Sequence, residues 1–600
     1  MSDGVDIAVR ALARSITPTR SKQRRAHRST RRLKVEPARF PSYALIFDTE
    51  TTTDELQQLN FGVWRYCRVN ETDGEVTLDC VAEGIVYADD LPTRDPAGYA
   101  VLVEYARTRL AWVDRDFLDS ARGLSLEPLS VWLRRVLWRA AYELRAAVVC
   151  FNSPFDLSRI AWQAGETRTY KPSERTDPFE GGFSFALFSY NRDGKRRESR
   201  YRPRVAIKSL DSKRSLKGFR SPERIDDQDL IPDGGGAPDR QWQFRGHFLD
   251  LRTLVFALTD TGHSLESACD PKAFNVPYVK RDVEHGRIYA DYVTYCREDV
   301  TATERLCERA LTAFLRHPIS LQATRAYSPA TIGKGYLKAM GITPPAKRHA
   351  IDPRILGHAM SAYYGGRSEC RIRRTPVPVV YCDFKSMYPT VCALMNLADL
   401  LTAETIEDVD ATAEVQQLLD QIDADGCFGP EQWPQFVGIA QLCPEGDVLP
   451  VRARYGAGPN WQIGVNPLTS TTPMWFTIPD LIASKLLTGN TPKIMRAIRF
   501  VGHGTIADLR PVDLLRTTRA HPAESDFFCT VIEQRTLAQR AGNTSASKGL
   551  KTLANATSYG IYAQMTRREL GGGRRGTRTR RALRGWRRDA RGARRAGHRR

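Results

Sequence analysis

Two carboxylates that follow an apolar run could bind a divalent cation. Asp48 and Glu50 come directly after YALIF, in the stretch YALIFDTETT. Residues i and i+2 of a strand point to the same side, so both carboxylates would face one cleft where the strand ends. Taken alone, the segment could equally hold two solvated acids at a strand end.

A third carboxylate stands in the same place relative to a second apolar run. Asp156 follows AAVVCF and opens a predicted helix, with Asn152 and Phe155 beside it. An aspartate that only caps the helix is the alternative interpretation, because acids are favoured in a first helical turn.

Tyr295 and Asp299 are four residues apart on a predicted helix and therefore share one face. Such a pair is often structural, but a phenol beside a carboxylate can also orient water while the carboxylate holds a cation. Four carboxylates and one tyrosine on separate elements suffice to bind two hard cations. Two such ions can activate water and stabilise the leaving oxygen of a phosphodiester.

The elements around these residues predict one α/β domain. Apolar runs predict strands at 43–47 and 146–151, and helical periodicity covers about 128–147 and 286–315. A polar interval rich in Gly and Pro, from about 165 to 240, predicts a long insertion.

A second set of elements is predicted further along the chain. A helical stretch continues to about residue 364, and TPVPVVYCDF predicts a strand at 375–384. Two helices, at about 524–541 and 546–558, are joined by AGNTSAS, which predicts a helical hairpin.

The three carboxylate segments, in this order, resemble the motifs Exo I (D-x-E), Exo II (N-x-x-x-F-D) and Exo III (Y-x-x-x-D) of family B DNA polymerases. The matching residues are Asp48, Glu50, Asn152, Phe155, Asp156, Tyr295 and Asp299. Two residues rather than three separate Asn152 from Phe155, which departs from the family pattern.

This resemblance implies a ribonuclease H-like domain with 3′→5′ proofreading exonuclease activity. Its four carboxylates would hold two Mg²⁺ or Mn²⁺ ions, and Tyr295 would complete the catalytic set. Asn152 and Phe155 would contact DNA.

The segment VVYCDFKSMYPTV resembles polymerase motif A, D-x-x-S-[LM]-Y-P, through Asp383, Ser386 and Tyr388. The resemblance implies that Asp383, at a strand end, holds two catalytic magnesium ions. Ser386 and its neighbours would meet a nucleoside triphosphate, and the Tyr388 ring would exclude a 2′-hydroxyl. For a lone strand, a buried tyrosine and a surface aspartate would be the alternative.

Tyr363, Gly365 and Gly366, in YYGGRSEC, resemble the Y-x-G-G junction of the same family. In relatives the junction lies between the two active sites and contacts template DNA. An ordinary turn is the alternative, because glycine is common in turns.

The segment ASKGLKTLANATSYGIYA resembles motif B, K-x-x-x-N-S-x-Y-G, of the polymerase fingers. Lys551, Asn555 and Tyr559 are spaced by four residues and share a helical face, although the family pattern puts Asn and Tyr three apart. By resemblance, Lys551 would reach the phosphates of a deoxynucleotide and Tyr559 the nascent base pair. Arg535 is a second candidate phosphate ligand, with a solvated helix face as the alternative.

The sequence thus predicts an α/β and α+β multidomain chain, and the resemblance implies that its parts are a ribonuclease H-like exonuclease domain, a partial polymerase palm and helical fingers. The expected segments are a basic arm (1–42), the exonuclease domain (43–315), a connecting helical segment (316–370), the palm with an insertion (371–520), the fingers (521–566) and a tail (567–600). The early position of Exo I and the insertion between motifs A and B are typical of the viral, plasmid and organellar branch, which includes protein-primed enzymes.

The basic charge is concentrated at the two ends. Of a net charge of +20, residues 1–39 carry +8 and residues 567–600 carry +13, which leaves about −1 between them. Charge alone therefore does not show that the body binds a polyanion. A disordered tail and an arm that touches nucleic acid are the two interpretations of residues 1–42.

The last residues contain no match to motif C, Y-x-D-T-D. From Arg567 onward, 26 of 34 residues are Arg, Gly or Ala. We expect a disrupted reading frame in a GC-rich gene, with a natural nucleic-acid-binding tail and a split polymerase as alternatives. Motif C would supply the second catalytic aspartate of the polymerase site, so without it primer extension is expected to be weak or absent.

The resemblance implies DNA primer–template, single-stranded 3′ ends and deoxynucleoside triphosphates as partners. It is also compatible with a terminal protein or replication factors as further partners. An exonuclease without polymerase activity and a non-catalytic DNA-binding remnant are the alternative functions. With no secretory signal, no long apolar run and twelve cysteines outside any C-x-x-C pair, we expect a cytoplasmic protein, at a nucleoid, plasmid or phage replication site, with no membrane partner.

Overall fold

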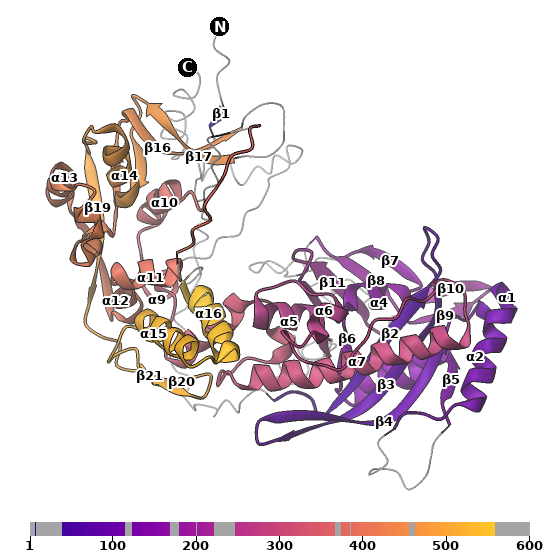
Figure 1. Cartoon of the computed structure of the whole chain (residues 1–600). Coiled ribbons are helices and arrows are strands. Elements are labelled where there is room, and N and C mark those ends of the chain that lie inside the picture. The colour runs from indigo at the N-terminus through magenta and orange to yellow at the C-terminus, as the bar shows by residue number, and fades with distance from the viewer. Residues whose placement is uncertain are drawn as a thin grey trace, which may run out of the picture.

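The structure is a computed structural model. It describes residues 6–7, 39–113, 123–167, 179, 181–199, 201–220, 246–366, 372, 374–384, 386–454 and 462–558. Figure 1 shows two lobes, one from the N-terminal half of the chain (indigo to magenta) and one mainly from the C-terminal half (orange). This is a mixed α/β structure with several sheets, compatible with an α+β multidomain chain.

The first lobe is built on a six-stranded sheet with the order β13-β6-β2-β3-β4-β5. Its strands are β2 (Tyr43–Thr51), β3 (Leu59–Thr72), β4 (Glu75–Tyr87), β5 (Ser125–Pro128), β6 (Ala147–Cys150) and β13 (His247–Asp250). β2, β6 and β13 run parallel to one another, whereas β3 is antiparallel to both β2 and β4.

Both expected strands of this domain are present, as β2 and β6. Residues 44–47 and 147–150 are buried without alternation, which is typical of strands covered on both faces. β2 packs against both the long helix α7 and the π-helical segment η3, which lie over the sheet. The helices of this lobe are α1 (Leu91–Arg94), α2 (Pro96–Thr108), α3 (Leu129–Trp132), η3 (Leu133–Glu143), α4 (Ser153–Arg159), α5 (Leu251–Thr259), α6 (Leu265–Cys269) and α7 (Ala290–Leu315).

The inserted segment between α4 and β13 contains regular structure that its polar composition did not indicate. It forms a four-stranded sheet of order β12-β11-β8-β7 and a separate hairpin of β9 and β10. The bounds are β7 (Gln163–Glu166), β8 (Phe183–Ala186), β9 (Ser189–Arg192), β10 (Lys195–Glu198), β11 (Arg204–Ser209) and β12 (Ser215–Arg220).

The second lobe has a four-stranded sheet of order β14-β19-β15-β18 and a sheet in which β16 lies between β17 and β1 (Asp6–Ile7). Its strands are β14 (Thr405–Asp410), β15 (Ile439–Leu442), β16 (Glu445–Arg454), β17 (Gln462–Thr469), β18 (Met474–Thr477) and β19 (Arg496–His503). A separate hydrophobic core joins β15, β16, β17, β18 and β19 to α13 (Thr412–Gln421) and α14 (Ile478–Thr488). Asp6–Ile7 is therefore a part of the basic arm with regular structure.

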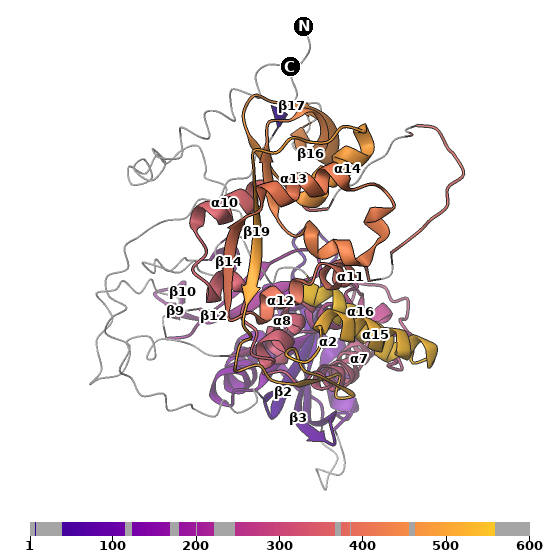
Figure 2. The ribbon, with the colours of Figure 1, turned by 90° about the vertical axis from the view of Figure 1, so that its left-hand side faces the viewer.

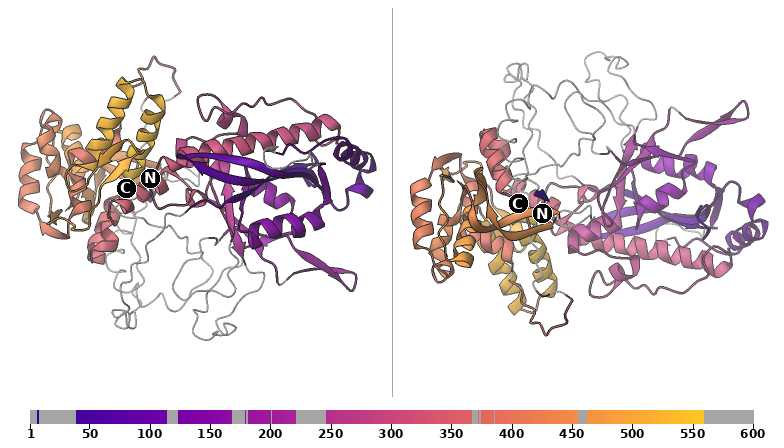
Figure 3. Two further views of the ribbon diagram at one scale, coloured as in Figure 1. Left: turned by 90° about the horizontal axis from the view of Figure 1, so that it is seen from below. Right: turned by 90° about the horizontal axis from the view of Figure 1, so that it is seen from above.

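Helices connect the lobes. Figures 2 and 3 show the lobes from other sides, and in Figure 2 the yellow helices lie at the level where the lobes meet. These are α15 (Phe527–Arg540) and α16 (Thr544–Ser558), the expected helical hairpin, and they pack against each other and against α11. The remaining elements are α8 (Pro329–Ala339), α9 (Pro345–Arg348), α10 (Pro353–Ala362), α11 (Met387–Leu394), α12 (Leu397–Thr402), β20 (Val512–Leu514), β21 (Thr518–Ala520), and the 3₁₀ turns η5 (Ala323–Arg325), η6 (Gly426–Phe428) and η7 (Pro430–Phe436).

The expected strand at 375–384 is wrong. Residues 374–384 are in neither a helix nor a strand, and Val379, Val380, Tyr381 and Phe384 are exposed. A strand needs a neighbour for its backbone groups, and no strand of the described chain pairs with this segment. Among the described residues, no helix is long and apolar enough to cross a lipid bilayer.

Candidate active site

Strand β2 positions Asp48 and Glu50 in the middle of the sheet. Their register partners on β3 are Val63 and Phe61, whereas the pairing of β2 with β6 covers only residues 44–46, so the two carboxylates lie beyond the end of that pairing. Glu50 is only 9% exposed. A side chain at Gly62, opposite Thr49, would place its Cβ 2.6 Å from the carbonyl oxygen of Asp48, so glycine allows this close strand approach.

Helix α4 adds Asp156, which is 1% exposed. Its Oδ1 accepts hydrogen bonds from the Thr49 backbone N–H (3.2 Å) and the Thr49 hydroxyl (2.8 Å). Thr49 stands between the two acids of β2, and therefore one residue fixes the position of the third acid relative to the first two.

Helix α7 supplies Asp299 and two tyrosines. The hydroxyl of Tyr292 donates to Glu50 Oε2 at 2.5 Å, and the ring of Tyr292 stacks near that of Tyr295 at a centroid distance of 6.4 Å. Asp299 Oδ1 accepts a hydrogen bond from the hydroxyl of Tyr278 at 2.6 Å. The structure thus brings together all four acids and the tyrosine of the three motifs.

Three neighbours of the acids did not emerge from the sequence. Tyr292 lies one helical turn before Tyr295, and this spacing could have found it. Tyr278 and His285 come from the irregular segment before α7, where no periodicity places a side chain. His285 Nδ1 lies 3.3 Å from the Tyr292 hydroxyl and 3.8 Å from Glu50 Oε2.

The four acids have raised pKa values, and burial is the largest cause in each case. Burial raises the pKa of Glu50 from 4.5 to about 7, and that of Asp156 from 3.8 to about 7. The pKa of Asp48 is also raised, by burial and by the negative charges of the other three acids. The pKa of Asp299 moves in the same direction.

Hydrogen bonds oppose these shifts. The Tyr292 hydroxyl lowers the pKa of Glu50, and the two hydrogen bonds from Thr49 lower that of Asp156. A hydrogen bond to a carboxylate favours its charged form. These donors therefore favour the charged form of the carboxylates, although burial and mutual repulsion have the larger effect on their pKa values.

Elsewhere in the same lobe, buried acids are paired with an arginine or, at Asp250, with a lysine. Glu83 accepts from the Arg297 guanidinium at 2.8 and 3.0 Å, and Glu304 accepts from Arg65 at 2.7 Å, with all four side chains buried. In the described part of the chain, neither lysine nor arginine forms an ion pair with Asp48, Glu50, Asp156 or Asp299. The protein compensates the charge of this cluster only in part, through Lys280, whose charge lowers the pKa of Asp299, and through His285 when that ring is protonated.

Two of the four acids lie close enough together to share one ion, with Cys296 beside them. Asp48, Glu50 and Cys296 offer ligand atoms that all lie within 4.8 Å of one another. Burial raises the pKa of the Cys296 thiol well above its ordinary value, so this sulfur is protonated when no cation is bound. Carboxylate oxygens without a soft ligand favour hard ions such as Mg²⁺ or Mn²⁺.

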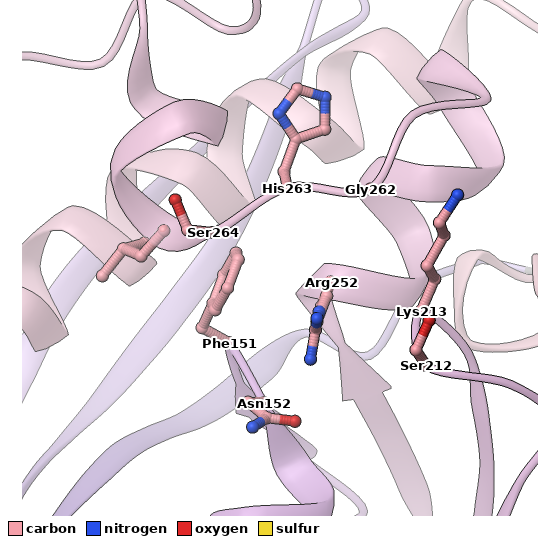
Figure 4. A pocket seen from close by; sticks show the side chains of 9 residues that line it. Phe151, Asn152, Ser212, Lys213, Arg252, Gly262, His263 and Ser264 are labelled. Atoms are coloured by element: carbon pink, nitrogen blue, oxygen red, sulfur yellow. The ribbon is translucent and has the colours of Figure 1, made fainter. Parts of the chain in front are cut away.

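Asn152 and Phe155 lie at the start of α4. Asn152 is the N-cap residue, but its side chain makes no capping hydrogen bond and instead lines a pocket (Figure 4). The Arg159 guanidinium lies 5.0 Å from the centre of the Phe155 ring.

The motif A residues and Arg535 form a second group. Ser386, which is 8% exposed and begins α11 in a left-handed conformation, accepts a hydrogen bond from Arg535 of α15. Burial lowers the pKa of Arg535, and the charge of Asp383 opposes this shift. Asp383 is exposed and does not end a strand, and Tyr388 is half exposed, contrary to the strand expected there.

The other described residues that were expected to contact DNA or a nucleotide lie on other elements, after α10 and on α16. Tyr363, Gly365 and Gly366 follow α10, with Gly365 at φ +85°, a conformation typical of glycine. On α16, Lys551 is exposed and Asn555 half-buried. Tyr559 and the tail 567–600 lie outside the described residues.

Comparisons of the chain with protein-family models, with curated proteins and with solved structures found no match in any of the three.

Proposed function

We propose that this chain is a metal-dependent nuclease that removes nucleotides from the 3′ end of single-stranded DNA, in a polypeptide of the family B DNA polymerase type. One observation carries the proposal: four acids converge at one site without an ion pair to a described lysine or arginine, whereas other buried acids of the lobe are paired with an arginine or a lysine. The 3′→5′ direction rests on the order and spacing of the three exonuclease motifs. The six-stranded sheet with α7 would then be the ribonuclease H-like exonuclease domain.

Two Mg²⁺ or Mn²⁺ ions held by Asp48, Glu50, Asp156 and Asp299 would supply water activation and charge stabilisation at the phosphodiester. Tyr295 would orient the attacking water. The water oxygen forms a bond to phosphorus, the bond from phosphorus to the preceding 3′-oxygen breaks, and that oxygen takes a proton. The products are a nucleoside 5′-monophosphate and a strand shortened by one nucleotide with a free 3′-hydroxyl.

The surrounding residues would hold this geometry. The Tyr292 hydroxyl fixes one carboxylate oxygen of Glu50, and the Tyr278 hydroxyl fixes one of Asp299. Thr49 fixes Oδ1 of Asp156. The Tyr295 hydroxyl also donates to Asp299, and the carboxylate oxygens that accept no hydrogen bond would face a cation. Residues that orient metal ligands in this way commonly change metal affinity 10- to 100-fold, by order of magnitude, when they are mutated.

The test uses a single-stranded oligonucleotide labelled at its 5′ end, with Mg²⁺ or Mn²⁺. The full chain should produce a ladder that shortens from the 3′ end, and the variant Asp48→Ala with Glu50→Ala should produce none while retaining its circular dichroism. Tyr295→Phe should slow the reaction less, because the ring remains and only the hydroxyl is lost. Folded wild-type protein that leaves the DNA intact would favour the non-catalytic remnant, and an unchanged rate in the double variant would mean that the site is misassigned.

A second candidate function, binding of a deoxynucleoside triphosphate, is favoured by the contact between Ser386 and Arg535. These residues come from the proposed palm and fingers, with Asp383 near enough to act on the charge of Arg535. A fluorescent deoxynucleotide should bind the wild-type chain and lose affinity in Arg535→Ala. We expect weak primer extension by the exonuclease-deficient variant, because Asp383 lies on an exposed segment that no described strand supports.

A further inference from the structure

A pocket lies beside the acidic site, where the inserted sheet meets the main sheet. Its volume is about 540 Å³, within the range of roughly 300–1,000 Å³ found for small-ligand sites. Figure 4 shows Phe151, Asn152, Lys213, Arg252 and His263 around it. Neither the carboxylate motifs nor the proposed hydrolysis uses Lys213 or Arg252.

The topology places the pocket and the acids at one edge of the sheet. β2, β6 and β13 are parallel neighbours, so their carboxyl ends meet at the same edge. Asp48 and Glu50 lie near the end of β2, whereas Phe151 and Arg252 follow β6 and β13. Ligands of open α/β sheets bind outside this edge. A single strand of DNA whose 3′ end reaches the acids would therefore have to pass the carboxyl ends of β6 and β13.

A buried ion pair ties the inserted sheet to this edge. Lys217 of β12 forms an ion pair with Asp250 of β13 at 3.1 Å, and Asp250 also accepts a hydrogen bond from the Ser153 backbone N–H of α4 at 3.0 Å. The insertion is thereby connected to the helix that carries Asp156. Its position relative to the acids is set by buried contacts.

The pocket contains two positively charged side chains, Lys213 and Arg252, that can bind an anion. Among the described residues, neither Lys213 nor Arg252 forms an ion pair with a carboxylate, and the buried Nε of Arg252 has no hydrogen-bond partner. The Lys213 ammonium lies 5.2 Å from the centre of the Phe256 ring, a cation–π contact. An anionic group would satisfy both side chains.

Lys213 is built into the pocket wall by the inserted sheet. It lies in the turn between β11 and β12, and its side chain crosses Gly262 in the loop after α5. A Cβ at position 262 would come within 3.0 Å of Lys213 Cε, so glycine provides the room for this crossing. Phe151, which is half-buried, supplies an aromatic ring at the opposite wall.

We propose that this pocket binds one nucleotide of the single strand upstream of the scissile phosphodiester, with Lys213 and Arg252 on its phosphate and Phe151 against its base. The inference rests on the proposed exonuclease function and extends it: the inserted sheet is part of the DNA-binding surface. Phosphate contacts by Lys and Arg together with aromatic stacking are the usual means of holding a single strand irrespective of its sequence.

The test measures binding of a fluorescent ten-nucleotide oligothymidylate to the full chain in EDTA, by anisotropy at several salt concentrations. Lys213→Met should weaken binding about three- to ten-fold and reduce the salt slope by about 0.7, the value for one phosphate contact on a single strand. Lys213→Glu should weaken it further. Lys195→Met is the matched control, because Lys195 is an exposed lysine on β10 of the same insertion, and it should bind as wild type does.

The result can be separated from that of the proposed function by the degradation rate at saturating DNA. Lys195→Met should leave this rate within about two-fold of wild type, because Lys195 does not line the pocket. If the wild-type chain degrades DNA but Lys213→Met matches it in affinity and salt slope, the pocket assignment is overturned and the exonuclease proposal stands. If Lys213→Met weakens binding but the wild-type chain degrades nothing, the pocket stands and the exonuclease proposal fails.

Discussion

Glu50→Gln should stabilise the protein at alkaline pH in the absence of metal and abolish its nuclease activity. The substitution removes a negative charge from a site that contains three other acids, and glutamine keeps an oxygen that can accept the Tyr292 hydrogen bond. Burial and repulsion raise the pKa of Glu50 from 4.5 to about 7. That difference corresponds to about 3 kcal/mol, which is an upper limit because the other acids adjust their protonation.

The sign of the pH dependence follows from the raised pKa. Between pH 4.5 and about 7 the folded protein holds a proton on Glu50 that the unfolded chain has lost, so stability falls as pH rises through this window. The variant should therefore match wild type at about pH 4.5 and gain its full advantage above about pH 7. Added Mg²⁺ should stabilise wild type more than the variant, because it binds the folded site.

The assay is thermal unfolding followed by circular dichroism, in EDTA at pH 5 and pH 8, with Glu83→Gln as the control. Glu83 is buried like Glu50 but is paired with Arg297, so its neutralisation should destabilise the protein by about 3 kcal/mol or more. The two substitutions should thus shift the unfolding midpoint in opposite directions at pH 8. A midpoint that falls in both variants would refute the claim that Glu50, unlike Glu83, has no arginine or lysine partner.

Two further predictions concern Thr49 and the exposed segment before α11. Thr49→Val should weaken Mn²⁺ binding at pH 6.5 by up to about 10-fold, because loss of the hydroxyl donor raises the pKa of Asp156 and lets protons compete with the metal. Unchanged affinity in a Mn²⁺ titration would show that this hydrogen bond has no effect on the site. Val380→Thr with Tyr381→Lys should raise solubility, measured by sedimentation of purified protein, and leave exonuclease activity unchanged, because these side chains are 89% and 91% exposed. Equal sedimentation of variant and wild type would contradict it.

The orientation of the acids within each segment could be predicted because it is local: alternation on a strand puts Asp48 and Glu50 on one side, and helical spacing stacks Tyr295 on Asp299. Their convergence was implied only by the resemblance, because the pairing of β2 with β6, which brings Asp156 to the same edge, joins segments about a hundred positions apart. Strands β2 and β6 were equally predictable, since both are continuous apolar runs.

Other features depend on contacts that the sequence does not encode locally. Tyr278 and His285 reach the acids from an irregular segment, and Lys213 reaches the pocket from an insertion whose polar composition suggested a loop. The segment 375–384 has the composition of a strand, but a strand forms only when a neighbour pairs with it. The pairing of Glu83 with Arg297, which sets the contrast with the active site, joins residues more than two hundred positions apart.

The central claim, that the acidic cluster is a site for divalent cations, is tested most directly by counting bound Mn²⁺ by electron paramagnetic resonance at pH 8. The wild-type chain should bind about two ions more than the variant Asp48→Ala with Glu50→Ala, because a two-metal site loses both ions when its shared ligands are removed. Equal Mn²⁺ binding by the two proteins, both folded by circular dichroism, would contradict the account.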